Sequence, residues 1–370
     1  MTVPHPRGGL VTSHSPVGHD RTTSPTEARR RSRRSLRAGL LALGLALVIP
    51  VAPWFGPGPG TTTAAALPLP PAATDGPVVV AHRGASGHAP ENTLAAVDAA
   101  AEQGVSWVEV DVQRTRDGEL VLLHDTTLRR TTDVAERFPD RAPWQVGDMD
   151  LAEVRQLDAG SWFSPEFAGE RVPTLRELLR RLDRHGQRLL LEIKAPARYP
   201  GIEREILREL AREGWLGPLR LYDSLILQSF DEDSVRTVHR LAPQVRTGFL
   251  GSPDSDELAD YAAFTHQINS RHTDLTAERV AAVRELRGPH GRRMEVFTWT
   301  VDDGPTAVRL AGMGVDGIIT NRPGEIREAL RGAGRGAPAP GEPPEENGSS
   351  GTDPLFRSRV PGTEGSPTGR

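Results

Sequence analysis

The sequence has 370 residues, a formal net charge of −4 and no cysteine. The lack of cysteine excludes disulfides, a thiolate zinc site and a lipidated cysteine. The small negative charge excludes a global basic field of the kind that gathers nucleic acid. Proline, glycine and arginine concentrate at the two ends. The part that can bury a core is therefore predicted as one domain over residues 77–331, a length that suits a single α/β barrel.

The N-terminal end carries the pattern of an export signal. Residues 1–39 lack hydrophobic periodicity, are expected to be disordered and end in a basic run, and residues 40–55 are apolar. A basic stretch directly before an apolar one is typical of such signals. The apolar run is shorter than the ~20 residues that a spanning helix needs. We expect an exported protein, secreted or at the cell surface, with a membrane anchor through residues 40–55 as the alternative.

The basic run leaves the export route open. Residues 32–37, Ser-Arg-Arg-Ser-Leu-Arg, are similar to a twin-arginine signal, but an arginine-rich stretch also serves general secretion. Residues 56–76 form an Ala/Pro linker, and residues 332–370 form a tail rich in Pro, Gly, Glu and Ser. Neither segment can bury enough apolar surface to offset its ordering entropy, so we expect a spacer and a disordered tail.

Between these ends, short β-branched or leucine-rich runs alternate with helical patterns. The runs lie at residues 78–81, 107–112, 189–193, 225–228, 247–250, 267–269, 296–300 and 317–320. Helices are predicted over residues 93–103, 174–185, 202–213, 232–241, 276–286 and 305–311. This alternation favours a closed parallel (β/α)₈ TIM barrel, in which functional side chains gather where strands end and loops begin.

The run Leu120–His124 differs from the barrel strands. Asp117 and Gly118 separate it from the strand before it, and this pair is a turn signal that folds a strand back antiparallel. The sequence therefore predicts a small hairpin or loop insertion after the second strand, and this hairpin carries His124 to the rim of the barrel.

Polar residues stand at the ends of nearly all the predicted strands. Glu109 and Asp111 are two residues apart and share one face of their strand, and Glu192 ends the following barrel strand. Three converging carboxylates repel one another unless protons or a hard cation such as Mg²⁺ or Ca²⁺ neutralise them. They are therefore candidate metal ligands. The alternative is a purely structural network of ion pairs with Arg83 and Lys194.

Four further strand-end residues suit phosphodiester cleavage. Arg83 offers a planar fork to phosphate oxygens, and Lys194 offers a compact positive charge. His82 and His124 come from elements that can face one another across the mouth of the barrel. Two imidazoles can exchange the roles of general acid and general base near neutral pH. The combination is a candidate catalytic site for a phosphodiester.

These residues fall within an ordered series of motifs. The series is His82-Arg83-Gly84, Pro90-Glu91-Asn92-Thr93-Leu94, Glu109-Val110-Asp111-Val112, Thr115-Arg116-Asp117-Gly118, Val121–Asp125, Pro173–Leu175, Glu192-Ile193-Lys194, Gln228–Phe230, Thr298–Val301 and Asp316–Thr320. It resembles the glycerophosphodiester phosphodiesterase family, with its phospholipase C-like barrel, over essentially the whole predicted domain. The resemblance implies metal-dependent hydrolysis of glycerophosphodiesters to an alcohol and sn-glycerol 3-phosphate.

The resemblance also implies roles for single residues. It assigns acid/base catalysis to His82 and His124, and metal binding to Glu109, Asp111 and Glu192. It assigns substrate binding to the cations Arg83 and Lys194 and to Trp299, which forms an aromatic wall. His124 is expected to be the acid because its hairpin lies farther out, and Asn92 is expected to cap the following helix. Asn321 departs from the aspartate usual in the family, which we expect to alter tuning rather than activity.

Other interpretations keep the barrel but change the function, because fold does not determine substrate. One is a phospholipase D-like or sphingomyelinase D-like enzyme, or a phosphoinositide phospholipase C-like enzyme. Such an enzyme needs exposed aromatic loops, and aromatic residues are only 5% of the chain. Another is a catalytically silent phosphate-binding module, which would lack a histidine or a carboxylate of the set. The expected partner is a small-molecule substrate, and no binding of nucleic acid is expected. Contact with a membrane is expected only through an uncleaved N-terminal segment, and the sequence does not determine the oligomeric state.

Overall fold

Nine strands form one sheet in the computed structural model, which describes residues 76–336. Pairing of β1 with β2 closes the parallel strands into a barrel, which confirms the predicted (β/α)₈ fold. The barrel strands are β1 (Val78–Ala81), β2 (Trp107–Arg114), β4 (Arg188–Ile193), β5 (Leu225–Ser229), β6 (Arg246–Leu250), β7 (Gln267–Arg271), β8 (Glu295–Trp299) and β9 (Gly317–Thr320). The remaining strand, β3 (Leu120–Leu122), runs antiparallel beside β2, as the turn signal predicted.

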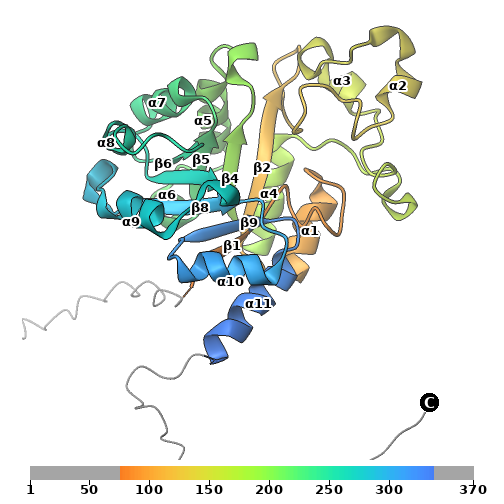
Figure 1. Ribbon diagram of the computed structural model, residues 1–370. Helices are drawn as coiled ribbons and strands as arrows, with labels where there is room; N and C mark the ends of the chain where they lie inside the picture. The colour runs from red at the N-terminus through yellow and green to blue at the C-terminus, as the bar shows by residue number, and fades with distance from the viewer. Residues whose placement is uncertain (1–75, 337–370) are drawn as a thin grey trace, which may run out of the picture. The chain divides into compact units, whose positions relative to one another are not determined.

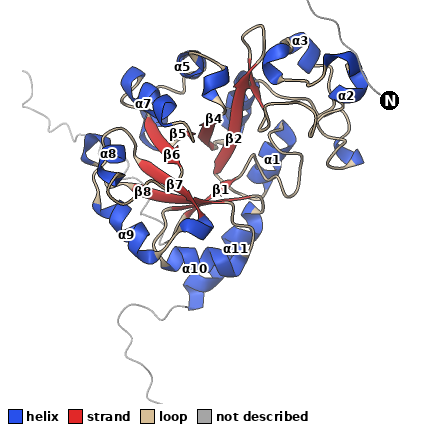
Figure 2. Ribbon diagram, turned by 45° about the horizontal axis from the view of Figure 1, so that its top comes forward, coloured by secondary structure: helices blue, strands red, loops and turns tan. Residues whose placement is uncertain are grey.

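Helices surround the strands on the outside (Figure 2). They are α1 (Leu94–Glu102), α4 (Leu175–His185), α5 (Ile202–Arg212), α6 (Pro218–Asp223), α7 (Glu232–Leu241), α8 (Leu258–Ala262), α9 (Ala277–Glu285), α10 (Gly304–Gly312) and α11 (Pro323–Gly336). The six predicted helices are all present. Helices α6, α8 and α11 were not predicted, because α6 and α8 are too short to show a period and α11 opens with Pro-Gly and continues past residue 331.

The two faces of each strand explain where the site lies. Along β2, Trp107 packs in the apolar cluster inside the barrel, while the valines that follow at every second position pack outward against the helices. Because side chains alternate, Glu109 and Asp111 share the inner face with Trp107, one and two steps nearer the C-terminal end. On β4, Leu190 and Glu192 repeat this arrangement. The barrel interior is therefore apolar below and acidic at its C-terminal end.

Residues 123–172 form an insertion that is larger than the small hairpin or loop expected. It contains α2 (Val134–Arg137) and α3 (Leu151–Val154), and it buries its own apolar cluster, which includes Leu128, Val146 and Leu157. Figure 1 shows α2 and α3 set apart from the other helices, beyond β2. These helices are one turn long, so the sequence carries no helical period that would predict them.

One expectation about the first loop is wrong. Thr93, and not Asn92, caps α1, since its hydroxyl accepts the N–H of Ala96 at 3.3 Å. The Asn92 side chain instead bonds both the backbone and the carboxylate of Asp111. Within residues 76–336, no helix has the length and apolar character of a membrane span. The predicted signal or anchor, linker and most of the predicted tail lie outside the described residues.

Candidate active site

A cavity of about 100 Å³ lies at the C-terminal ends of the strands. Its walls contain nearly all the residues predicted for the site, namely His82, Arg83, Glu109, His124, Glu192, Lys194 and Trp299. The exception, Asp111, is buried, and its carboxylate pairs with Arg83 and Lys194. The structure thus brings the whole predicted set together at the predicted end of the barrel.

The loop after β1 explains the His-Arg-Gly sequence. Arg83 has a φ of 54°, which non-glycine residues seldom adopt, and its backbone N–H donates to Glu109 Oε2 at 2.9 Å. Gly84 follows with a φ of 80°, and a Cβ there would lie 2.6 Å from Ala96 of α1. Glycine therefore lets the loop pack closely on the helix, and this packing holds His82 and Arg83 at the strand end.

Three carboxylates form an acidic cluster in the barrel mouth. Glu109, Asp111 and Glu192 are buried, and each offers an oxygen within 4.8 Å of the others. Burial, together with the neighbouring carboxylates, raises the pKa of Glu109 well above its ordinary value. Burial and the charge of Asp111 raise the pKa of Glu192 to about 8. Fully ionised, the cluster would carry more negative charge than its surroundings neutralise, and without a cation protons take up the excess.

Two cations compensate only part of this charge. Lys194 Nζ lies 3.2 Å from Asp111 Oδ1 and 2.6 Å from Glu192 Oε1, and Arg83 Nε lies 3.4 Å from Asp111 Oδ2. Against the effect of burial, these cations hold the pKa of Asp111 well below its usual range. The ion-pair network is thus real, yet Glu109 and Glu192 keep raised pKa values. Oxygen donors in this number and spacing fit a hard divalent cation, so the cluster could hold a metal ion.

His82 is held as a neutral imidazole. Its Nδ1 lies 2.7 Å from Oδ1 of Asn321, whose side-chain NH₂ donates to Asp302 at 2.7 Å. The amide oxygen must therefore accept, so the His82 hydrogen is on Nδ1 and the lone pair is on Nε2. Burial and the adjacent Arg83 lower the pKa of His82 to about 4. Its Nε2 lies 3.9 Å from Glu109 Oε2, beside the acidic cluster.

His124 is oriented by a chain of charged groups. Its Nδ1 lies 2.8 Å from Oδ1 of Asp125, and Arg130 donates to both Asp125 oxygens at 2.7 and 3.1 Å. Arg130 also donates to both oxygens of Glu91, at 2.7 and 2.8 Å. Glu91 in turn accepts a hydrogen bond from Arg83 at 2.9 Å. One guanidinium thus links the residue that orients His124 to the residue that orients Arg83.

An aromatic wall closes one side of the cavity. The indole N–H of Trp299 donates to the carbonyl of Asn269 at 2.9 Å, and its ring makes a T-shaped contact with Phe230, with ring centroids 5.5 Å apart. Phe230 is 51% exposed although it is large and apolar. Lys194 Nζ lies 5.7 Å from the centroid of the Phe230 ring. Trp299 therefore has the position predicted for it, and Phe230 extends the wall toward solvent.

Comparison with known proteins identifies the family. The model of the glycerophosphoryl diester phosphodiesterase family matches residues 82–325. The chain belongs to this family. A glycerophosphodiester phosphodiesterase from Caldanaerobacter subterraneus is 34% identical over 261 residues, which are 70% of this chain and 99% of that protein. One from Bacillus subtilis is 32% identical over 269 residues, 69% of this chain and 87% of that protein.

A solved structure agrees with these relatives. An Oleispira antarctica phosphodiesterase, in complex with its product sn-glycerol-3-phosphate, aligns with a TM-score of 0.57 at 30% identity, over 69% of this chain and 97% of that chain. The chain is accordingly an enzyme, a phosphodiesterase that acts on glycerophosphodiesters, as the motifs implied.

Three residues at the site were not predicted from the sequence to have a role there. Phe230 appears in the sequence only as part of a motif, and its exposure depends on how the loop after β5 leaves the barrel. Arg130 stands beside Arg129, and no sequence signal tells which of the two reaches the site. Asp302 is 19 residues from its partner Asn321, and the parallel pairing of β8 with β9 places them together.

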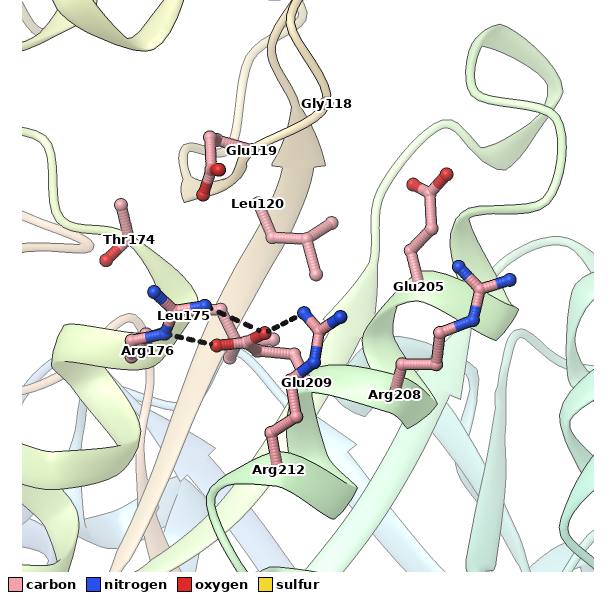
Figure 3. A pocket seen from close by; sticks show the side chains of 10 residues that line it. All are labelled: Gly118, Glu119, Leu120, Thr174, Leu175, Arg176, Glu205, Arg208, Glu209 and Arg212. Atoms are coloured by element: carbon pink, nitrogen blue, oxygen red, sulfur yellow. Dashed lines mark hydrogen bonds and ion pairs between the residues drawn. The ribbon is translucent and has the colours of Figure 1, made fainter.

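A separate cavity of about 210 Å³ lies along α4, α5 and the start of β3, and Figure 3 shows its lining residues. Arg176 and Arg212 both point to the carboxylate of Glu209 and bond it at 2.6 and 3.2 Å. Its lining contains as many acidic as basic side chains, and the candidate site residues are not among them. The Arg176–Glu209 pair joins α4 to α5, the Arg212–Glu209 pair lies within α5, and we assign the cavity no function.

Proposed function

We propose that the chain hydrolyses glycerophosphodiesters to an alcohol and sn-glycerol 3-phosphate with a divalent metal ion, Ca²⁺ or Mg²⁺, held by Glu109, Asp111 and Glu192. The supporting observation is the charge of the site: buried carboxylate oxygens gather within 4.8 Å, and the two adjacent cations leave the pKa of Glu192 raised to about 8. A bound cation of this kind neutralises the carboxylates and polarises a phosphoryl oxygen.

His82 is proposed as the general base. Its lone pair is on Nε2, and with a pKa lowered to about 4 the ring is neutral near pH 7 and ready to accept a proton from the attacking oxygen. His124 is then the general acid, which protonates the departing alkoxide. Its Nδ1 is held by Asp125, so Nε2 is the nitrogen available to the substrate.

Substrate binding is proposed for Arg83, Lys194 and Trp299. Arg83 presents a fork to the phosphate from a loop fixed by its own backbone hydrogen bond, and Lys194 supplies a point charge from the end of β4. Trp299 packs against the apolar edge of the bound glycerol, since it lines the cavity together with Leu250 and Ile319.

Neither alternative interpretation gains support. A silent module would lack part of the catalytic set, whereas all of it converges on one cavity or its immediate edge. An enzyme that enters a bilayer would need neighbouring exposed apolar side chains. In the described part of the chain the large exposed ones are Trp162, Leu219 and Phe230, on three different segments.

Metal removal tests this function. Exhaustive chelation is expected to abolish hydrolysis of glycerophosphocholine, and added Ca²⁺ or Mg²⁺ is expected to restore it, measured by release of sn-glycerol 3-phosphate. In the metal-loaded enzyme, His82→Ala and His124→Ala should each lower kcat by about 10²-fold with little change in KM. Full activity after chelation would contradict the metal assignment, and unchanged turnover in either variant would contradict the histidine pair.

We also propose that the protein is exported, by the twin-arginine or the general route. The support is the basic run followed by the apolar residues 40–55, both outside the described residues. N-terminal sequencing of the protein recovered from its host tests the proposal. A chain that begins at Met1 in the cytoplasm would contradict it, and an uncleaved chain in the membrane fraction would support an anchor.

A further inference from the structure

A second cavity adjoins the catalytic one. Its volume is about 350 Å³, and it shares His124, Glu192, Lys194 and Phe230 with the catalytic cavity of about 100 Å³. Its other walls are the loop after β4 at residues 195–197, Thr126, and the loop after β5 with Asp231. The shared residues show that the two cavities meet at the proposed general acid.

The position of the acid indicates which part of a substrate each cavity takes. A general acid must lie within hydrogen-bond reach of the oxygen that it protonates, so the departing ester oxygen lies at His124. The smaller cavity contains His82, Arg83 and Glu109 and is closed by Leu250, Trp299 and Ile319 from the barrel wall. The phosphate and its glycerol fill that space, which leaves the larger cavity as the continuation beyond the departing oxygen.

We propose that the larger cavity binds the departing alcohol, and that Phe230 and Asp231 make it select an alcohol that carries a cationic group. The proposal rests on the function proposed above, because it takes His124 to be the acid. It concerns the part of the substrate beyond the phosphate.

Charge in the larger cavity favours a cation. One carboxylate oxygen of Asp231 caps α7 by accepting the N–H of Ser234 at 2.8 Å. The other oxygen has no hydrogen bond or ion pair with the part of the chain that the structure describes, so it is available to a ligand. Lys194, a cation of the lining, is already paired with Asp111 and Glu192. An ammonium group in the cavity therefore meets a carboxylate that is still available.

The aromatic ring adds to this selection. Phe230 lines both cavities and is 51% exposed, so part of its surface is open to a ligand. The face of an aromatic ring attracts cations, and quaternary ammonium groups are bound in this way. The ring is held by a T-shaped contact with Trp299, with centroids 5.5 Å apart, and Lys194 Nζ lies 5.7 Å from its centroid, so a ligand cation would use the part of the ring surface that Lys194 does not cover. A choline or ethanolamine group fits these requirements better than a neutral polyol of similar size.

The first test changes charge alone. Asp231→Asn keeps the helix cap, since asparagine caps as well as aspartate. The ratio of kcat/KM for glycerophosphocholine to kcat/KM for glycerophosphoglycerol should fall about threefold to fivefold, the effect of losing a partly exposed ion pair. Asp303→Asn is the matched control, because Asp303 caps α10 through Thr306 and lines neither cavity. That variant should keep the ratio of the unaltered enzyme.

The second test changes space alone. Ala197 is exposed and lines the larger cavity, and its neighbour Ala195 is avoided because its φ of 43° makes substitution strained. Ala197→Trp should raise KM for glycerophosphocholine relative to the inhibition constant of sn-glycerol 3-phosphate, since the product occupies the smaller cavity. Ala152→Trp, on the exposed part of the insertion, is the control.

The outcomes separate the two proposals. An unchanged ratio in Asp231→Asn overturns the selection for a cation, and equal weakening of diester and product in Ala197→Trp overturns the assignment of the cavity. In both cases, hydrolysis of the two diesters by the unaltered enzyme leaves the proposed function standing. Failure of the unaltered, metal-loaded enzyme to hydrolyse either diester would overturn the proposed function as well.

Discussion

Arg130 joins two parts of the active site that come from different elements. Its guanidinium forks onto Asp125, which holds His124 after β3, and onto Glu91, which holds Arg83 after β1. Bidentate pairs of this kind fix direction as well as distance. Because the side chain of Arg130 is 43% exposed, the pairs contribute little to global stability. Their effect is to set the position of the acid relative to the phosphate site.

Arg130→Lys tests this positioning role. Lysine keeps the charge but cannot make bidentate bonds to two carboxylates at once. Asp125 and Glu91 are then no longer linked, and the positions of His124 and Arg83 relative to one another are less well fixed. We expect kcat for glycerophosphocholine to fall between about 10-fold and 100-fold with the melting temperature nearly unchanged, because small misplacements of catalytic groups are costly. The losses of Arg130→Lys and His124→Ala should combine less than additively, which steady-state kinetics of the double variant would show.

Arg129→Lys is the matched control for that experiment. Arg129 is adjacent and rests on the ring of Trp144, with its guanidinium carbon 5.9 Å from the centroid. Its replacement should leave kcat within about twofold of the unaltered enzyme, as is usual for surface changes. A similar loss in both variants, or full additivity with His124→Ala, would show that Arg130 has no positioning role.

Asn321 and Asp302 behave as a matched pair. Asn321 donates its side-chain NH₂ and its backbone N–H to the carboxylate of Asp302, at 2.7 and 2.8 Å. An aspartate at position 321 would place its own carboxylate about as close to the carboxylate of Asp302, and the two negative charges would repel. Asp302 therefore explains the departure from the family pattern, since it supplies a carboxylate that is linked to His82 through the side chain of Asn321.

The double exchange tests this explanation. Asn321→Asp alone should destabilise the protein by about 1 kcal/mol at pH 8, because two partly exposed carboxylates then repel one another. Adding Asp302→Asn should recover most of this loss, since the amide and the carboxylate simply change places. Thermal unfolding of the three variants at pH 8 measures the effect. A double variant no more stable than Asn321→Asp would contradict the exchange.

At the scale of elements, the insertion and the barrel have separate cores. Leu157 is fully buried in the cluster of the insertion, whereas Leu179 is fully buried between α4 and the barrel. The insertion carries Arg130 and, near its start, His124, while the acidic cluster lies on β2 and β4. Loosening the insertion should therefore disturb the acid without disturbing the metal ligands.

Leu157→Ala tests this separation. Large-to-small changes in a core cost about 2–5 kcal/mol, and here the loss should appear as local opening of residues 123–172. We expect faster proteolysis within the insertion and a lower kcat, with metal binding retained by calorimetry. Leu179→Ala should instead lower the melting temperature of the whole barrel. Equal effects of the two changes on metal binding and on proteolysis would show that the insertion and the barrel unfold together.

The barrel strands could be predicted from the sequence, whereas the helices of the insertion could not. Barrel strands are continuous apolar runs because both faces are buried, so the sequence reveals them and the polar residues at their ends. Inside the insertion, α2 and α3 are one turn long and their order comes from a shared core. Asn92 was misassigned for a related reason: its sequence position suits a helix cap, but a left-handed φ of 58° turns its side chain to Asp111. Local signals cannot show such long-range partners.

On the scale of the whole molecule, a few buried groups determine how stability depends on pH. His82 and His266 have pKa values of about 4 and about 3 in the folded protein, against an ordinary value of 6.5. The folded protein therefore favours the neutral form of both rings. Stability from these two groups rises with pH up to about 6.5 and is then constant. Glu192 acts in the opposite direction. Its folded pKa of about 8 lies above the ordinary 4.5, so its contribution is complete below pH 4.5 and is lost as pH rises through 8.

The metal-free enzyme should therefore lose stability between pH 6.5 and 8.5, where the histidine terms are constant and Glu192 still titrates. One group can contribute on the order of 1–2 kcal/mol over this range, equal to a fall of a few degrees in melting temperature. Calorimetry after chelation measures the fall. Saturating Ca²⁺ or Mg²⁺ should reduce it, because a cation keeps the carboxylate ionised in the folded state. Glu192→Gln should make the fall in the metal-free profile smaller, with the rest of the fall due to Glu109, whose pKa is also raised, while Glu166→Gln on the exposed part of the insertion should leave the fall unchanged. A metal-free melting temperature that is level or rising over this range would contradict raised pKa values at Glu192 and Glu109.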